Sequence, residues 1–145
     1  MKQYKHTQIG YLMVIALGIA VLLIGNLVRI TNFNPTAALL LALMVLCLAS
    51  FATMTVEVDA EAISLRLGIG VIRRRFLLKE VESYRTVKNP VYYGWGIHLI
   101  PNGWIFNVSG LQAVELQMRN GRTYRIGTDD VRGLTNAVET NMQKV

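Results

Sequence analysis

The chain has 145 residues, enough for about one compact domain, and 52% of them are hydrophobic. The apolar residues gather toward the N-terminus, where no charged residue occurs from Ile9 to Val28 or from Ile30 to Val56. The net charge of +6 falls to +3 over residues 56–145, which is too small to indicate nucleic-acid binding.

The two uncharged segments predict a pair of transmembrane helices at about 9–30 and 35–55. A helix needs roughly 20 apolar residues to cross a hydrocarbon layer of about 30 Å, and each segment provides them. A secretory signal is the alternative for the first segment, since Lys2 and Lys5 precede it. Against it, no small-residue cleavage site ends the segment, and a second apolar segment follows almost at once. We therefore expect a two-span hairpin at 9–55.

Basic residues predict the orientation of this hairpin, because cytoplasmic segments of membrane proteins carry an excess of Lys and Arg. The tail at residues 1–8 is basic, whereas the connector between the spans carries only Arg29. The first forty residues after the second span contain seven basic residues: Arg66, Arg73, Arg74, Arg75, Lys79, Arg85 and Lys88. We therefore expect a multi-pass protein of the cell (inner) membrane with both termini in the cytoplasm. The single cysteine, Cys47, lies in the second span, so no intramolecular disulfide can form.

Residues 56–145 alternate apolar and polar side chains, which predicts a domain built mainly of antiparallel strands. In the segment "TVEVDAEAISLRLG", pairing Val58 with Ile63 brings every aliphatic side chain to one face of a hairpin. A turn at Gly68-Ile69-Gly70 leads to a third strand near 71–77, and a fourth strand follows a short turn.

The next hairpin is predicted in "YGWGIHLIPNGWIFNVSG", because Asn-Gly is typical of a two-residue type I′ loop. A loop at Asn102-Gly103 pairs Pro101 with Trp104 and Leu99 with Phe106. In this register one face holds six apolar residues, which we expect to form barrel wall: Trp95, Ile97, Leu99, Trp104, Phe106 and Val108.

A second Asn-Gly pair, Asn120-Gly121, predicts a different loop. A three-residue loop with Gly121 in a left-handed bulge pairs Leu116 with Tyr124, and only this register keeps the apolar faces together. After the last strand, Thr128 is expected to cap a terminal helix. That helix has one apolar stripe, formed by Val131, Leu134, Val138 and Met142.

With these elements in place, the chain resembles the bacterial pleckstrin-homology-like domains, and in particular small membrane proteins with two N-terminal spans and one such domain. The resemblance rests on "ISLRLGIGVIRRRFLLKEVESYRTV", "YGWGIHLIPNGWIFNVSG" and "AVELQMRNGRTYRIGTDD", and it covers about residues 54–142. It implies a PH-like seven-stranded open barrel capped by a C-terminal helix, which serves binding or scaffolding. The first hairpin loop, "DAEA", is acidic where phosphoinositide-binding relatives are basic, which argues against that ligand.

The arginines of the first strands are the candidate contact residues for lipid or a partner protein. Arg73 and Arg75 share one face of the third strand, Arg74 lies on the opposite face, and Arg66 is the only basic residue of the first hairpin. Near a membrane surface, each such cation contributes about 1 kcal/mol toward anionic headgroups. The competing interpretation is a solvated strand edge, where charges discourage edge-to-edge pairing.

No catalytic, metal-binding or cofactor-binding motif accompanies these arginines. His98 has no second histidine nearby, and Ser109 does not lie in the glycine-flanked turn of a hydrolase. We therefore expect a membrane-anchored, non-catalytic binding or scaffolding module that faces the cytoplasm and has no cofactor. The alternative is an inner-leaflet lipid-responsive sensor, and a membrane enzyme comes third. The expected partners are the bilayer, anionic phospholipid headgroups and other membrane proteins.

Overall fold

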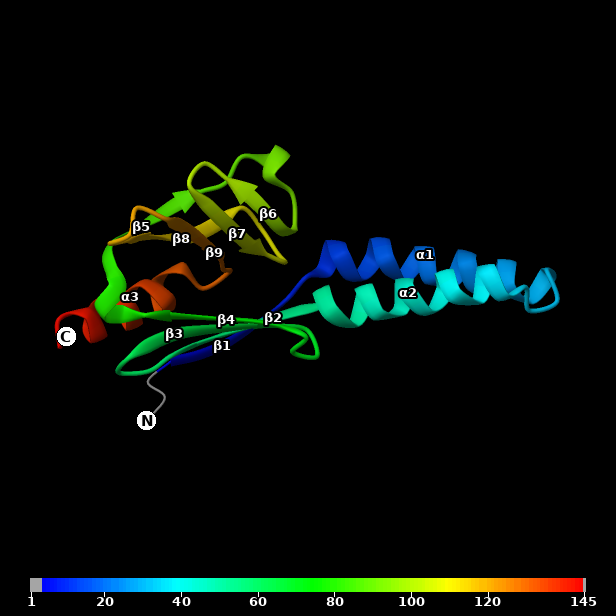
Figure 1. The fold of residues 1–145 in the computed structure, drawn as a ribbon, viewed down its shortest axis with the longest axis horizontal. Coiled ribbons are helices and arrows are strands. Elements are labelled where there is room, and N and C mark those ends of the chain that lie inside the picture. The colour runs from blue at the N-terminus through cyan, green and yellow to red at the C-terminus, as the bar shows by residue number, and fades with distance from the viewer. Residues whose placement is uncertain (1–3, 145) are drawn as a thin grey trace.

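Two apolar helices project as a hairpin from a domain made of two β-sheets and a third helix, as the computed structural model shows (Figure 1). The structure describes residues 4–144, so the basic residue Lys2 of the predicted tail and Val145 lie outside the described residues.

The helical hairpin consists of α1 (Tyr11–Ile30) and α2 (Pro35–Phe51). Asn34 caps α2, because its side chain accepts hydrogen bonds from the backbone N–H groups of Thr36 and Ala37 at 3.0 and 3.3 Å. Within residues 4–144, α1 is the one helix long and apolar enough by length and composition to span a membrane, since α2 has 17 residues. The second helix is therefore shorter than the predicted 35–55, since the chain leaves it for a strand after Ala52.

The first sheet, sheet A, is antiparallel and has the strand order β1-β2-β3-β4. Its strands are β1 (Tyr4–Ile9), β2 (Thr53–Val58), β3 (Ala62–Leu67) and β4 (Ile72–Leu77). The predicted pairing of Val58 with Ile63 is confirmed. The prediction of a tail at 1–8 is wrong for its described part, because residues 4–8 belong to β1, which pairs with β2 along its whole length.

The second sheet, sheet B, has the order β5-β8-β9-β7-β6, in which β7 and β9 are parallel and the other pairs antiparallel. Its strands are β5 (Val81–Lys88), β6 (Gly96–Ile100), β7 (Gly103–Asn107), β8 (Gln112–Met118) and β9 (Thr123–Gly127). Two short 3-10 helices, η1 (Leu78–Glu80) and η2 (Val91–Tyr93), flank β5.

The predicted seven-stranded barrel is therefore wrong in detail. The described residues form nine strands in two separate sheets, and no single sheet holds seven strands. Two features explain the difference: β1 adds a strand that the sequence pattern did not predict, and η1 carries the chain from sheet A to sheet B without pairing β4 with β5.

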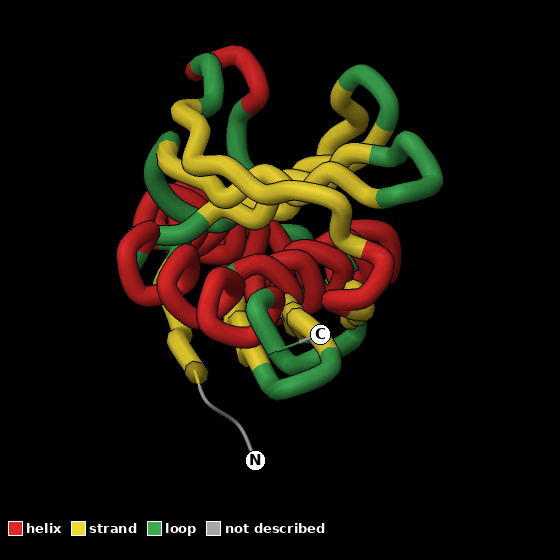
Figure 2. The backbone as a smooth tube through the Cα atoms, turned by 90° about the vertical axis from the view of Figure 1, so that its left-hand side faces the viewer, coloured by secondary structure: helices red, strands yellow, loops and turns green. Residues whose placement is uncertain are grey.

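The two sheets enclose the hydrophobic core together with α3 (Val131–Met142). In Figure 1 sheet B lies on one side of α3 and the strands of sheet A on the other, and Figure 2 again shows strands above and below the helices. Leu134 and Val138 of the predicted helical stripe are fully buried. The cap of α3 is Asp130, whose side chain accepts from the Gly133 N–H at 3.0 Å, and not the predicted Thr128.

The hairpin β6–β7 has another register than the predicted one. Ile100 lies opposite Gly103 and Leu99 opposite Trp104, so the loop consists of Pro101 and Asn102. Gly103 is a strand residue because β9 approaches it closely: a Cβ atom at this position would lie only 1.5 Å from the Thr123 carbonyl oxygen.

The predicted aromatic wall holds in part only. Phe106 and Val108 are buried, but Trp104 is 40% exposed and Leu99 is 72% exposed. By contrast, the β8–β9 hairpin follows its prediction, with Leu116 opposite Tyr124 and Gly121 at a φ of 82°.

Candidate functional site: an arginine cavity on sheet A

The outer face of sheet A carries two rows of polar side chains that run across all four strands. The register places Thr7, Thr55, Arg66 and Arg73 in one row, and Lys5, Glu57, Ser64 and Arg75 in the other. The alternation of each strand sends these side chains outward while Val56, Val58, Ile63 and Leu65 enter the core.

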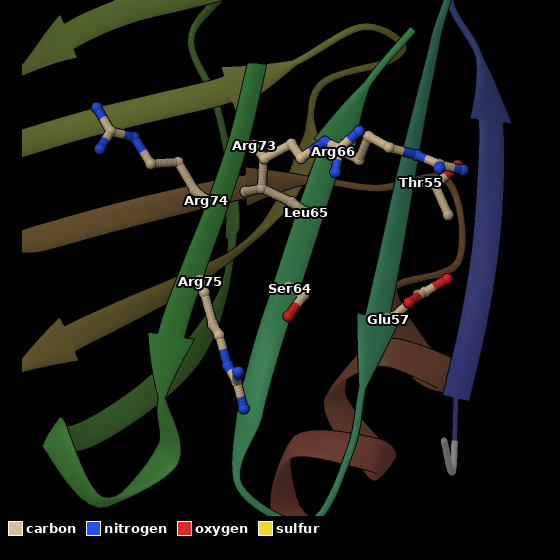
Figure 3. Close-up of a pocket in the computed structure, with 8 residues that line it drawn as sticks. All are labelled: Thr55, Glu57, Ser64, Leu65, Arg66, Arg73, Arg74 and Arg75. Atoms are coloured by element: carbon tan, nitrogen blue, oxygen red, sulfur yellow. The ribbon is translucent and has the colours of Figure 1, made fainter. Parts of the chain in front are cut away.

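A cavity of about 400 Å³ opens on this face, and its lining includes the three predicted contact residues Arg66, Arg73 and Arg75 (Figure 3). We call it the arginine cavity. The other side chains of the two rows that line it are Thr55, Glu57 and Ser64. Figure 3 shows Arg66 and Arg73 extending in the same direction across the sheet, toward β2. The structure thus brings together residues from two strands that the sequence could only place singly.

The three arginines differ in their partners. Arg73 Nε donates a 2.8 Å hydrogen bond to the Gly70 carbonyl, which fixes its side chain beside the β3–β4 turn. Arg75 Nη2 lies 3.5 Å from Glu61 Oε2, and both of these side chains are largely exposed. Arg66 lies directly opposite Arg73 in the antiparallel ladder. Like charges at opposed positions destabilise a sheet, so a bound anion would stabilise this pair.

The cavity lies next to the base of the helical hairpin. The turn between β3 and β4 is attached to the end of α2, because the Ile69 N–H donates to the Ala49 carbonyl at 3.2 Å. The Gly68 N–H donates to the Thr53 carbonyl at 2.7 Å. A Cβ on Gly68 would lie 2.0 Å from the Ala49 carbonyl oxygen, so only glycine allows this approach.

Arg74 lies on the opposite face of β4 from its two neighbours, as alternation predicted. Figure 3 shows its side chain pointing away from the other arginines. It lines a second cavity of about 210 Å³ between the two sheets, together with Phe76, Glu80, Trp104 and Arg122. Arg74 also belongs to the lining of the arginine cavity, but its side chain extends away from Arg66 and Arg73.

The outer face of sheet B carries a charge cluster that the sequence pattern did not predict, in which Glu115 is buried, Arg125 is partly buried and Arg85 is exposed. Glu115, on β8, lies opposite both Arg85 and Arg125. Its Oε2 accepts from Arg125 Nε at 2.6 Å, and its Oε1 accepts from Arg85 Nε at 2.7 Å. Arg125 also donates to Asn89 at 3.1 Å and lies over the Tyr93 ring. Apolar and polar residues alternate along β5, β8 and β9, which indicates that the side chains of Arg85, Glu115 and Arg125 face outward. That they meet could be predicted only with the order of the three strands in the sheet.

Electrostatics makes the Glu115 cluster structural. Burial by itself raises the pKa of the Glu115 carboxyl, but the hydrogen bonds and charges of Arg125 and Arg85 outweigh it and lower the pKa below its ordinary value. A carboxylate held in this way stays ionised and has both oxygens occupied. It is therefore poorly suited to general acid–base chemistry.

A second unpredicted set of contacts joins β1 to the segment that precedes α3. The Tyr4 hydroxyl donates to Asp130 at 3.1 Å, His6 lies 2.5 Å from Asp129, and Gln8 donates to the Gly127 carbonyl at 2.6 Å. Burial, the hydrogen bond to Asp130 and the charges of the two aspartates raise the pKa of the Tyr4 hydroxyl. These contacts attach the strand that enters α1 to the far end of the chain.

The remaining candidate, His98, is exposed, and its Nε2 lies 2.6 Å from the Trp95 carbonyl oxygen. Among residues 4–144, no group of three or more His, Cys, Asp and Glu side chains is placed to hold a metal ion.

Comparisons with protein-family models, curated proteins and solved structures give no match to this chain.

Proposed function

We propose that the protein is a membrane-anchored, non-catalytic binding module in which α1 and α2 both span the membrane and a pleckstrin-homology-like domain faces the cytoplasm. The carrying observation is the connection between hairpin and domain. Both helices continue at their base into adjacent strands of one sheet, and the Gly10 N–H donates to the Ala52 carbonyl at 2.8 Å between them. Such a connection holds the domain at a fixed place beside the membrane.

The exposure of the helices supports membrane insertion. Only 6% of the most apolar stretch of α1 is buried, whereas the core helix of a soluble protein is mostly buried. At 1.5 Å per residue α1 is about 30 Å long, the thickness of the hydrocarbon layer. The 17 residues of α2 lie at the lower limit of roughly 17–25 for a spanning helix.

The position of β1 favours a permanent anchor over a cleaved signal sequence. This strand precedes α1 in the chain, yet it pairs with β2 through six residue pairs and buries Gln8 at the core edge. Cleavage after α1 would remove a strand from sheet A. The orientation with both termini in the cytoplasm follows from the basic residues Lys2 and Lys5 and the arginines after α2.

A second candidate, an inner-leaflet lipid-responsive sensor, is favoured by the arginine cavity. Its three arginines face the same side of sheet A, and their strands are joined by the turn that contacts α2. A domain that only binds another protein does not require its arginines to lie beside the base of the helical hairpin.

Two measurements on the full chain test the proposal. Alkaline carbonate extraction of membranes should leave the protein in the membrane fraction, and a periplasm-active reporter fused after Val145 should stay silent while a cytoplasm-active one is active. Release by carbonate would overturn the anchor, and periplasmic activity would overturn the orientation.

A further inference from the structure

We infer that Arg66 and Arg73 bind the phosphate group of an anionic phospholipid in the leaflet beside the domain, with Ile69 and Val71 of the intervening turn inserted among the lipids. This inference rests on the proposed membrane anchor and names the ligand of the arginine cavity.

The side chains of Arg66 and Arg73 approach each other at the turn. Gly70 has a φ of 90°, and a Cβ at this position would lie 3.0 Å from both Arg66 Cδ and Arg73 Nη2. Glycine therefore lets both arginine side chains approach the same backbone site. Guanidinium groups hydrogen-bond phosphate oxygens in a planar, often two-pronged geometry, which suits a ligand bridging the pair.

The charge around this pair favours an anion. The acidic residue in the cavity lining, Glu57, stands in the other row than Arg66 and Arg73. Its Oε1 lies 3.3 Å from Lys5 Nζ of the same row. Arg75, by contrast, is two residues farther from the turn than Arg73 and lies near Glu61. We therefore assign the phosphate contact to Arg66 and Arg73 and a lesser role to Arg75.

The depth of the pair matches the headgroup layer. If α1 fills the hydrocarbon layer, the boundary of that layer lies near Tyr11, at the base of the hairpin and beside the last turn of α2. The β3–β4 turn is bonded to that last turn at Ala49. Arg66 lies two residues before Gly68, about 7 Å along the strand, while a headgroup layer is about 5–7 Å thick on each side.

Exposed apolar side chains on the same turn support this depth. Ile69 is 63% and Val71 66% exposed, and the two project from a turn that touches the base of the apolar hairpin. In water their exposure is unfavourable, whereas at the membrane interface both are buried among lipid chains. Two arginines beside two aliphatic residues form an amphipathic surface suited to an anionic leaflet.

The test measures lipid binding to the full chain. The protein in neutral detergent is titrated with phosphatidylglycerol or phosphatidylcholine, and bound lipid is counted by native mass spectrometry. The test variant is Arg66→Gln/Arg73→Gln. Its control is Arg119→Gln/Arg122→Gln, which removes the same charge from exposed residues at the β8–β9 loop. This loop lies at the end of sheet B away from the helical hairpin (Figure 1), where the backbone N–H of Arg119 donates to the Glu80 carbonyl oxygen.

We expect the wild type to retain phosphatidylglycerol in preference to phosphatidylcholine. The test variant should bind phosphatidylglycerol roughly 30-fold more weakly, from two near-surface cations, while the control keeps nearly its full affinity. Equal losses in both variants would show attraction by net charge alone and overturn the site, as would no loss in either.

Free phosphate shares this chemistry, so a further arm adds inorganic phosphate in place of lipid. Phosphate that binds without lipid, or that displaces phosphatidylglycerol, would assign the cavity to a soluble ligand and overturn the lipid assignment. Failure of the proposed anchor would be seen separately, as release of the protein by carbonate. A chain that stays in the membrane yet shows no lipid preference refutes this inference alone.

Discussion

The side chain of Gln8 donates a 2.6 Å hydrogen bond to the carbonyl oxygen of Gly127, and this bond joins residues 119 positions apart. Gln8 is 1% exposed, so the bond is buried at the edge of the core, where β1 meets the connection to α3. The strand that leads into α1 is thus held to the C-terminal part of the domain by a buried polar contact.

Replacing Gln8 by Ala is expected to destabilise the full chain by about 2–3 kcal/mol, because the Gly127 carbonyl loses a buried partner and a void replaces the side chain. Lys5→Ala is the control on the same strand. It removes the ion pair of the exposed Lys5 with the partly buried Glu57, which contributes about 1 kcal/mol. Denaturant unfolding in detergent measures both, and equal losses would show that the Gln8 contact has no special weight.

Glu115 predicts how stability depends on pH. Its pKa is lower in the folded chain than in the unfolded chain, so its contribution is complete above the unfolded value of about 4.3 and is lost as the pH falls through the folded value. Replacing Glu115 by Gln leaves Arg125 partly buried without its counter-charge, at an expected cost of about 3 kcal/mol at neutral pH.

Between neutral pH and about pH 3, the melting temperature of the wild type should therefore fall steeply. That of Glu115→Gln should fall less steeply, because the variant has already lost this contribution. Parallel curves would mean that other carboxyl groups control acid unfolding.

The sequence predicted the local geometry of strands well where one face of each strand meets the core. Val58 opposite Ile63 and the Gly121 bulge follow from keeping aliphatic residues together. The same dipeptide failed at Asn102-Gly103, because the position of Gly103 is set by Thr123 on β9, a contact that local sequence does not contain. Strand β1 was missed for a related reason: its inward residues Tyr4, His6 and Gln8 are polar, since they meet polar groups at 127–130.

The candidate site was predictable residue by residue but not as a site. Alternation placed Arg73 and Arg75 on one face of a strand, and Arg66 was the lone basic residue of the preceding hairpin. That Arg66 lies opposite Arg73 depends on the register of β3 with β4, and that both lie beside the hairpin depends on the contact of Ile69 with Ala49. These are tertiary relationships that alternation does not specify.

The revised register of β6–β7 changes what a tryptophan substitution should do. The sequence pattern predicts Trp104 in the barrel wall, but this residue is 40% exposed, whereas Phe106 on the same strand is 2% exposed. Trp104→Ala is therefore expected to cost less than about 2 kcal/mol, and Phe106→Ala about 3–5 kcal/mol. Unfolding curves of the two variants measure these losses. A larger loss of stability for Trp104→Ala than for Phe106→Ala would support the original prediction that Trp104 is buried.

Substitution of Gly70 tests whether lipid binding at the arginine cavity can be lost independently of stability. Gly70→Ala places a Cβ at a φ of 90° and 3.0 Å from both Arg66 Cδ and Arg73 Nη2, so both side chains must shift away from the turn. Gly121→Ala is a matched control, because its φ is 82° and no atom lies within 4 Å of the added Cβ.

A left-handed conformation costs a non-glycine residue about 1–2 kcal/mol, so both variants should lose similar stability. Only Gly70→Ala should also weaken retention of phosphatidylglycerol, because it displaces the side chains of Arg66 and Arg73, while Gly121→Ala should bind as the wild type does. Unfolding curves and native mass spectrometry on the same preparations measure the two properties. If Gly70→Ala binds the lipid normally, the arrangement of Arg66 and Arg73 around this turn does not form the binding site.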